Sequence, residues 1–328
     1  MTADFFRHEP TARSSWRLAV LMGANARTYK FALGSALLGF AAEGRDDVPL
    51  DVLASAYAMG IVDHLDAAPQ APRGSVGAPT DFLNVATREA AASKAAGSPT
   101  EELLRATVAT IPGMVMRKFH NLRGENGVPH RFYELDRGSR MVRLLPALRE
   151  IASGEELPGL RRELDARWNI VEFSFSAEIG RSLTHEGFAL DSQAMLLTDR
   201  RRRRAVTGVV PAVTGFQYGR CLICWQPLDD GTPVAVDHVL PFSLMSRFSP
   251  WPGPDLDAVW NLAPTHAPCN SGKSDRMPTA EELGRLTARN TAIMDSPHPL
   301  SRTLDGVLKN HKVRTWYEFL REVTEIVR

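Results

Sequence analysis

The sequence predicts an α+β protein of two domains, a mainly helical one over residues 1–195 and a smaller one with β-strands over residues 196–328. Three observations support this division. A chain of 328 residues is longer than one ordinary domain. Apolar residues recur at helical spacing in much of the first half of the chain. All three cysteines lie in the last third, on either side of a short β-prone segment.

The composition is that of a folded globular protein, with 44% hydrophobic and 23% charged residues. Residues 196–328 hold 17 Lys/Arg and 14 Asp/Glu, a net +3, against 22 and 24, a net −2, in residues 1–195. A surface that binds nucleic acid therefore has to be a local patch. Because no signal peptide is evident and residues 18–42 contain Arg27 and Lys30, we expect a cytoplasmic protein without a membrane span.

The first part of the N-terminal domain is predicted to consist of helices. Ser15 is expected to cap the first helix, residues 31–40 to form the second, and Pro49 to open the third. Residues 67–80, rich in proline, alanine and glycine, predict a loop. The pair Asp63-His64 lies on the third helix without any partner motif, so we interpret it as structural.

The rest of this domain is predicted from signals at the ends of its elements. Residues 82–97 are expected to form a helix, and residues 98–101, Ser-Pro-Thr-Glu, are interpreted as a capping box that starts the next one. Residues 131–135 and 140–144 are predicted to pair as a hairpin. Residues 145–173 return to a helical pattern.

The C-terminal domain begins with a run of arginines. These are Arg200, Arg201, Arg202, Arg203 and Arg204. The run is either a solvated face or loop, as charge runs commonly are, or a strip that binds phosphates beside a functional site. Helices are expected at the end of the domain, over residues 281–290 and 316–327.

Two pairs of possible metal ligands lie between the arginines and these helices. Cys221 and Cys224 are separated by two residues, and so are His266 and Cys269. An odd number of cysteines in a chain without a secretion signal argues against a disulfide framework. Four such side chains can complete a structural zinc site with no open position. The alternative is that the cysteines are ordinary buried residues and that His266 is a loop residue.

The segment between the pairs carries candidate catalytic residues. Residues 234–236 favour a strand that ends at Asp237 and His238, where a rigid backbone can direct both side chains into a cleft. An imidazole can take a proton from water near neutral pH, and a carboxylate suits Mg²⁺ or Mn²⁺. Asn270 offers a second oxygen ligand, which zinc bound at the neighbouring Cys269 would hold in place.

Taken singly, an Asp-His pair, an asparagine or a lysine is most simply interpreted as a surface or turn residue. Their order and spacing reverse this interpretation, because Asn261 is followed at five, eight, nine and twelve positions by His266, Cys269, Asn270 and Lys273. The pattern resembles the HNH, or ββα-metal, endonuclease superfamily, in the branch with two flanking zinc-binding pairs. It departs from that branch in having His266 where a cysteine is usual, and asparagine rather than histidine at the third signature position.

The resemblance covers residues 196–328 and implies a ββα-metal nuclease domain with a structural zinc ion. By that resemblance Asp237 and Asn270 bind a catalytic Mg²⁺ or Mn²⁺, and His238 is the general base. Asn261 orients His238, and Lys273 contacts phosphate. The residues that resemble the zinc ligands are Cys221, Cys224, His266 and Cys269.

We therefore expect a metal-dependent endonuclease that hydrolyses DNA and leaves 5′-phosphate and 3′-hydroxyl ends. A bacterial restriction or antiphage defence role is expected, with the N-terminal domain as sensor or as binding site for a partner protein. Two other functions stay open. One is a non-catalytic zinc module that binds nucleic acid or protein. The other is an RNA-cutting toxin, because such a metal site attacks a phosphate and does not read the sugar.

Overall fold

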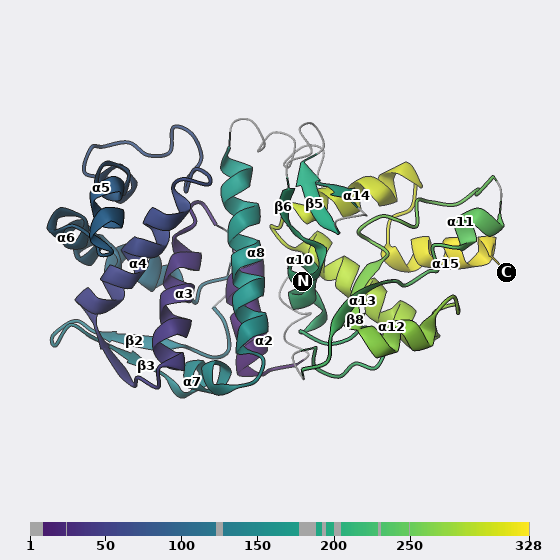
Figure 1. Cartoon of the computed structure of the whole chain (residues 1–328), viewed down its shortest axis with the longest axis horizontal. Coiled ribbons are helices and arrows are strands. Elements are labelled where there is room, and N and C mark those ends of the chain that lie inside the picture. Colours follow the sequence, from purple (N-terminus) through teal and green to yellow (C-terminus); the bar gives the residue numbers. More distant parts are fainter. Residues whose placement is uncertain are drawn as a thin grey trace. The chain divides into compact units, whose positions relative to one another are not determined.

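The computed structural model divides into two compact units, each with its own core (Figure 1). The N-terminal unit consists of the described residues within 6–157 and 167–180, and the C-terminal unit of those within 158–166 and 181–328. The residues described are 9–23, 25–122, 127–176, 188–191, 195–199, 205–228, 231–248 and 250–327. The α+β class is confirmed. Helix α8 (Leu157–Phe175) contributes to both units, so the units do not follow a single cut in the chain.

The N-terminal unit is mainly helical, with one small antiparallel sheet in the order β1-β3-β2. Its strands are β1 (Asp47–Pro49), β2 (Tyr133–Asp136) and β3 (Met141–Leu144). Besides α8, its helices are α2 (Ala12–Arg17), the π-helix η1 (Leu18–Met22), α3 (Tyr29–Ala42), α4 (Leu50–His64), α5 (Phe82–Ala96), α6 (Glu101–Thr110), the π-helix η2 (Pro112–Met116) and α7 (Pro146–Ser153).

Helix α3 lies at the centre of this unit, between α4 and α7 (Figure 1). Its apolar residues are buried on most of its circumference, and Phe31, Leu33 and Leu37 are fully buried. Complete burial stabilises each such side chain by about 1.5–3 kcal/mol. The predicted hairpin forms as β2 and β3, with Leu135 opposite Val142. His64 stacks on Trp168, 3.6 Å between ring centroids, a packing contact.

Two helix caps differ from those predicted. The cap of α2 is Thr11, whose side chain accepts from Ser14 N, whereas Ser15 lies inside the helix and its hydroxyl bonds to His130 at 2.8 Å. The cap of α6 is Thr100, which accepts from Leu103 N at 3.2 Å. The predicted capping box began two residues too early, because both hydroxyl residues of the Ser-Pro-Thr segment carry a plausible capping side chain.

The C-terminal unit starts with a three-stranded antiparallel sheet that the sequence did not reveal, in the order β4-β5-β6. These strands are β4 (Phe188–Asp191), β5 (Leu196–Asp199) and β6 (Ala205–Gly208). The Arg200–Arg204 run lies between β5 and β6, outside the described residues, so its predicted phosphate contact stays a prediction.

The remainder of the C-terminal unit surrounds a two-stranded antiparallel sheet of β7 (Val234–His238) and β8 (Leu262–His266). Helices α14 (Leu300–Asn310) and α15 (Trp316–Ile326) at the end of the chain pack against α13 (Ala280–Asp295), and Trp260, Trp316 and Phe319 form an aromatic cluster. The helices are α10 (Val209–Thr214), the 3₁₀ turn η3 (Gly215–Gln217), α11 (Leu244–Arg247), α12 (Ala267–Lys273), α13 (Ala280–Asp295), α14 (Leu300–Asn310) and α15 (Trp316–Ile326). Across the described residues, no helix combines the length and the apolar character that crossing a membrane requires.

Candidate metal centre and adjoining pocket

Two antiparallel strands and the helix that follows them bring the sequence-predicted site residues together. β7 and β8 pair from Val234 opposite His266 to His238 opposite Leu262. Helix α12 begins directly after β8 and packs against both strands. Asp237 and His238 therefore come from the end of one strand, and Asn270 and Lys273 from the neighbouring helix.

The four predicted zinc ligands converge at one place. The ligand atoms of Cys221, Cys224, His266 and Cys269 all lie within 4.8 Å of one another. Nδ1 of His266 lies 3.3 Å from Sγ of Cys224 and 3.9 Å from Sγ of Cys269. Three sulfurs and one imidazole nitrogen are the donors of structural zinc sites. The cluster could therefore hold a metal ion such as zinc.

The hydrogen bonds around the cluster fit a bound metal. Nε2 of His266 lies 2.9 Å from Pro227 O, and a donated N–H there leaves the lone pair of Nδ1 for a metal. The backbone N–H of His266 points to Sγ of Cys221 at 3.4 Å. Burial, and then contact with the thiols of Cys224 and Cys221, raises the pKa of Cys269 to about 12. Metal binding replaces such protons, which links metal affinity to pH.

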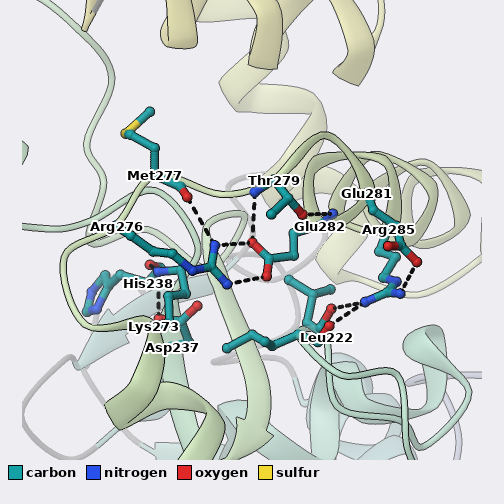
Figure 2. A network of polar contacts seen from close by, with 11 residues as sticks. Leu222, Asp237, His238, Lys273, Arg276, Met277, Thr279, Glu281, Glu282 and Arg285 are labelled. Atoms are coloured by element: carbon teal, nitrogen blue, oxygen red, sulfur yellow. Dashed lines mark hydrogen bonds and ion pairs between the residues drawn. The ribbon is translucent and has the colours of Figure 1, made fainter.

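Arg285 of α13 binds the backbone of the Cys221–Cys224 turn. Its guanidinium donates to Leu222 O at 2.8 Å and to Ile223 O at 2.6 Å, and it also pairs with Glu281 (Figure 2). It stacks on the Trp225 ring, with 4.9 Å to the centroid. The backbone carbonyls between the two cysteines are thereby satisfied and fixed relative to α13.

A second contact fixes the start of α13 relative to the end of α12. Arg276 forms a bidentate ion pair with Glu282, at 2.8 and 2.6 Å, and Glu282 also accepts from Thr279 N in a capping box (Figure 2). Hydrogen bonding to Arg276 holds the pKa of Glu282 below its usual value. The ion pair with Arg276 outweighs the opposing effect of burial, so this carboxylate stays ionised and is held in place.

Lys273 lies elsewhere than we expected from the sequence. We expected its ammonium to contact phosphate, but its side chain is only 1% exposed. Nζ donates to Oδ1 of Asp237 at 3.0 Å and to His238 O at 2.9 Å (Figure 2). The reason is its position at the last turn of α12, which faces β7 and not solvent. Lys273 thus ties the helix to the strand end that carries both candidate catalytic residues.

Asp237 is a buried carboxylate with its two oxygens in different environments. Burial raises its pKa, and the charge of Lys273 opposes that rise. Oδ1 is paired with Lys273, whereas Oδ2 has no hydrogen-bond partner within the described part of the chain. A buried polar atom without a partner is costly unless something else binds it.

His238 is oriented by a residue that the sequence did not reveal. Its Nε2 lies 2.8 Å from Oδ1 of Asp257, and both side chains are partly exposed, at 23% and 25%. A carboxylate at this distance accepts a hydrogen bond from the Nε2 N–H, which leaves Nδ1 as the basic nitrogen. Asp257 lies in the irregular segment between β7 and β8, where no sequence periodicity marks it.

Asn261 is fully buried and holds the chain after His238 in place. Its amide nitrogen donates to Leu240 O at 2.8 Å and Leu256 O at 2.9 Å, and its Oδ1 accepts from Leu240 N at 2.8 Å. None of these side-chain hydrogen bonds, as found among the described residues, goes to His238. Asn261 therefore joins both ends of the segment between the strands, including the end next to Asp257.

One open pocket joins the candidate catalytic residues. Asp237, His238 and Asn270 line it together with Phe242, which is 50% exposed and lies 5.5 Å from the His238 ring. The remaining lining residues are Val236, Pro241, Ser243, Ser246, Ser274 and Asp275. The cluster of three cysteines and His266, here called the Cys₃His cluster, shares helix α12 with this pocket, because Cys269 and Asn270 are neighbours in sequence.

Comparison with known proteins finds no family model, no curated protein and no solved structure that matches this chain.

Proposed function

We propose that the protein is a metal-dependent endonuclease that hydrolyses phosphodiester bonds of DNA. One observation carries the proposal: an imidazole (His238), a carboxylate with one unpaired buried oxygen among the described residues (Asp237) and an amide side chain (Asn270) line one open pocket next to a Cys₃His cluster. Phosphodiester hydrolysis needs an attacking water, a base for its proton, and charge relief at the phosphate and the leaving oxygen.

His238 is the general base of this proposal. With its Nε2 N–H donating a hydrogen bond to Asp257, the neutral imidazole takes the proton of the attacking water at Nδ1. The Asp257 carboxylate stabilises the imidazolium that forms. The water oxygen bonds to phosphorus, the bond from phosphorus to the 3′ oxygen breaks, and the departing 3′ oxygen takes a proton from solvent water, so that the ends are a 5′-phosphate and a 3′-hydroxyl.

Asp237 and Asn270 are the proposed ligands of a catalytic Mg²⁺ or Mn²⁺. The fit lies in the donor set, since Oδ2 of Asp237 is buried without a partner within the described ranges and hard divalent cations bind carboxylate and amide oxygens. The ion, when bound, neutralises phosphate charge and stabilises the leaving oxygen. Lys273 pairs with Oδ1 of Asp237. This ion pair fixes the orientation of the carboxylate and therefore the position of Oδ2.

The Cys₃His cluster is proposed as a structural zinc site. Zinc there would fix α12 at Cys269 and thereby the position of the adjacent Asn270. Asn261 fixes the chain after β7, and Arg285 fixes the Cys221–Cys224 turn. Catalytic side chains need support of this kind, because small displacements of a reacting group are costly for rate.

The test is an incubation of the full-length protein with supercoiled plasmid and, separately, with total RNA. Mg²⁺ or Mn²⁺ should support plasmid nicking or linearisation with 5′-phosphate ends, and EDTA should abolish it. Asp237→Asn should be inactive, whereas Asp305→Asn, on α14 away from the pocket, should behave as wild type. Cleavage of RNA alone would identify an RNA-cutting toxin, and nucleic-acid binding without cleavage would identify a non-catalytic zinc module.

The cellular role belongs to the same proposal. We propose that the nuclease acts in the cytoplasm as a bacterial restriction or antiphage defence effector and that its N-terminal unit receives a partner or signal. The test is protection of cells against phage infection by the wild-type chain and its loss in Asp237→Asn. Equal protection by both would refute this role.

A further inference from the structure

The N-terminal unit contains a pocket that the proposed nuclease chemistry does not use. Residues just before and at the start of α3 form one wall of it, including Asn25, Tyr29 and Lys30, and residues of η2 and its end form the other, including Val115 and Lys118. Its volume is about 350 Å³, within the range of small-molecule sites. No acidic side chain is among the described residues that line it.

Lys30 is the unusual residue of this pocket, because its side chain is almost completely buried and no ionic partner for it is found in the described part of the chain. It is 7% exposed, and Nζ donates to Ala19 O at 3.3 Å and lies 5.8 Å from the Phe119 ring. Throughout the described residues no carboxylate pairs with it. Burial, and then repulsion from Arg167, lowers the pKa of Lys30 to about 8, so the amine is still largely protonated near neutral pH.

Arg167 of α8 adds a second buried cation to the same unit. The residue is 2% exposed, and neither Nε nor Nη1 has a hydrogen-bond partner within the residues described. A buried charge costs several kcal/mol unless it is paired. Two such cations that repel each other leave this region of the unit with positive charge that no described side chain compensates.

The other basic side chains of the pocket differ in their availability. Arg27 donates hydrogen bonds of 2.9 Å to both carboxylate oxygens of Asp81 and further ones to Tyr29 and Ser75. Its charge is therefore compensated by Asp81, and it adds no net charge to the pocket wall. Lys118 is exposed at the rim, and no ion pair of it is found among the described residues. An anion that entered the pocket would therefore meet Lys118 at the rim and Lys30 at depth.

The volume of the pocket and its lining residues determine which kind of anion fits it. Met114, Val115 and the ring of Tyr29 give the pocket an apolar part. Its volume is about ten times the roughly 30 Å³ that one water molecule occupies in the liquid, more than an inorganic phosphate fills. A ligand that satisfies both features carries a phosphate at one end and a flat, largely apolar group at the other.

We propose that this pocket binds a nucleoside phosphate, with its phosphate between Lys30 and Lys118 and its base against the apolar wall. The bound phosphate supplies Lys30 with a counter-charge that the described residues do not provide. The inference concerns the N-terminal unit alone and does not depend on the proposed nuclease activity.

The test is a titration of the full-length protein, by calorimetry and thermal shift, with the four ribonucleoside 5′-monophosphates, their nucleosides and inorganic phosphate. EDTA is present throughout, so that a metal-mediated complex at the C-terminal pocket is excluded. At least one monophosphate should bind and raise the melting temperature, more tightly than its nucleoside and than phosphate alone.

Two substitutions locate the site. Lys30→Met should weaken binding at least about tenfold, because it removes a charge-assisted contact in a buried position. Lys118→Met, at an exposed position where the fold tolerates change, should weaken it severalfold, and Lys94→Met on α5 should leave it unchanged. The proposal is overturned if no monophosphate binds, if the nucleoside or phosphate alone binds as tightly, or if Lys118→Met and Lys30→Met both bind as wild type.

Discussion

The buried pair of Lys273 and Asp237 gives the sharpest test of the site geometry. The substitution Lys273→Met keeps the unbranched shape of the side chain, one atom shorter, and removes its charge. Asp237 is then a buried carboxylate without its cation, with side-chain exposures in the pair of 1% and 4%. Removal of one partner of a buried ion pair costs about 3–5 kcal/mol. The double variant Asp237→Asn/Lys273→Met should regain more than half of that loss, because no unpaired charge remains.

A chain of two units has no single free energy of unfolding, so the stability of the C-terminal unit has to be measured by itself. Hydrogen exchange of peptides from β7 and β8 measures it. At about 1.4 kcal/mol for each factor of ten, protection should fall by two to four powers of ten. The opposite outcome is equally clear. Unchanged protection, with weaker DNA binding and a salt slope reduced by about 0.9, would show that Lys273 contacts phosphate and that the ion pair is wrong.

Zinc, a buried histidine and the arginine run give three further predictions. Elemental analysis should find one zinc per chain, and Cys224→Ser should lose zinc, solubility and activity together; a metal-free active protein would contradict this. His120, whose pKa burial lowers to about 4, accepts from Phe132 N, so stability should fall by about 3 kcal/mol as pH drops from 6.5 to 4. Hydrogen exchange of peptides from β2 and β3, which reports on the N-terminal unit alone, should show that loss in the wild type and not in His120→Gln. Replacing Arg200–Arg204 with glutamine should flatten the salt dependence of DNA binding by about 0.9 per phosphate contact; an unchanged slope identifies a solvated face.

The sign of the His120 effect follows from proton binding. Between pH 4 and 6.5 the unfolded chain binds a proton at this residue and the folded chain does not, so acid favours unfolding. The contribution is complete above the unfolded pKa of about 6.5.

Elements with regular apolar spacing could be predicted from the sequence, and so could ligands at fixed spacing. Helices α3, α4 and α5 and the β2–β3 hairpin were predicted because each repeats its buried side chains at a regular interval. The four cluster residues were predicted because metal ligation fixes the interval within each pair. Helix α14 was not predicted, although Leu300, Leu304 and Leu308 lie on one of its faces.

Contacts that depend on the tertiary fold could not be predicted. Asp257 reaches His238 from an irregular segment, and nothing in a single sequence states which acidic residue such a segment turns inward. The burial of Lys273 likewise depends on which face of α12 meets β7, and a three-residue interval from Asn270 does not determine it. Arg285 was unnoticed because its partners are backbone carbonyls, which leave no trace in sequence.

The most direct measurement of the central claim is the single-turnover rate of plasmid cleavage in Mg²⁺ by the wild type, His238→Ala and His311→Ala. His311 is exposed in the same unit and serves as the matched control. Loss of a general base costs about 10²–10⁴-fold in rate, so His238→Ala should fall by that factor with DNA binding retained, while His311→Ala cleaves as wild type. Cleavage by His238→Ala at a rate near that of the wild type would contradict the assignment of the base and the proposed mechanism with it.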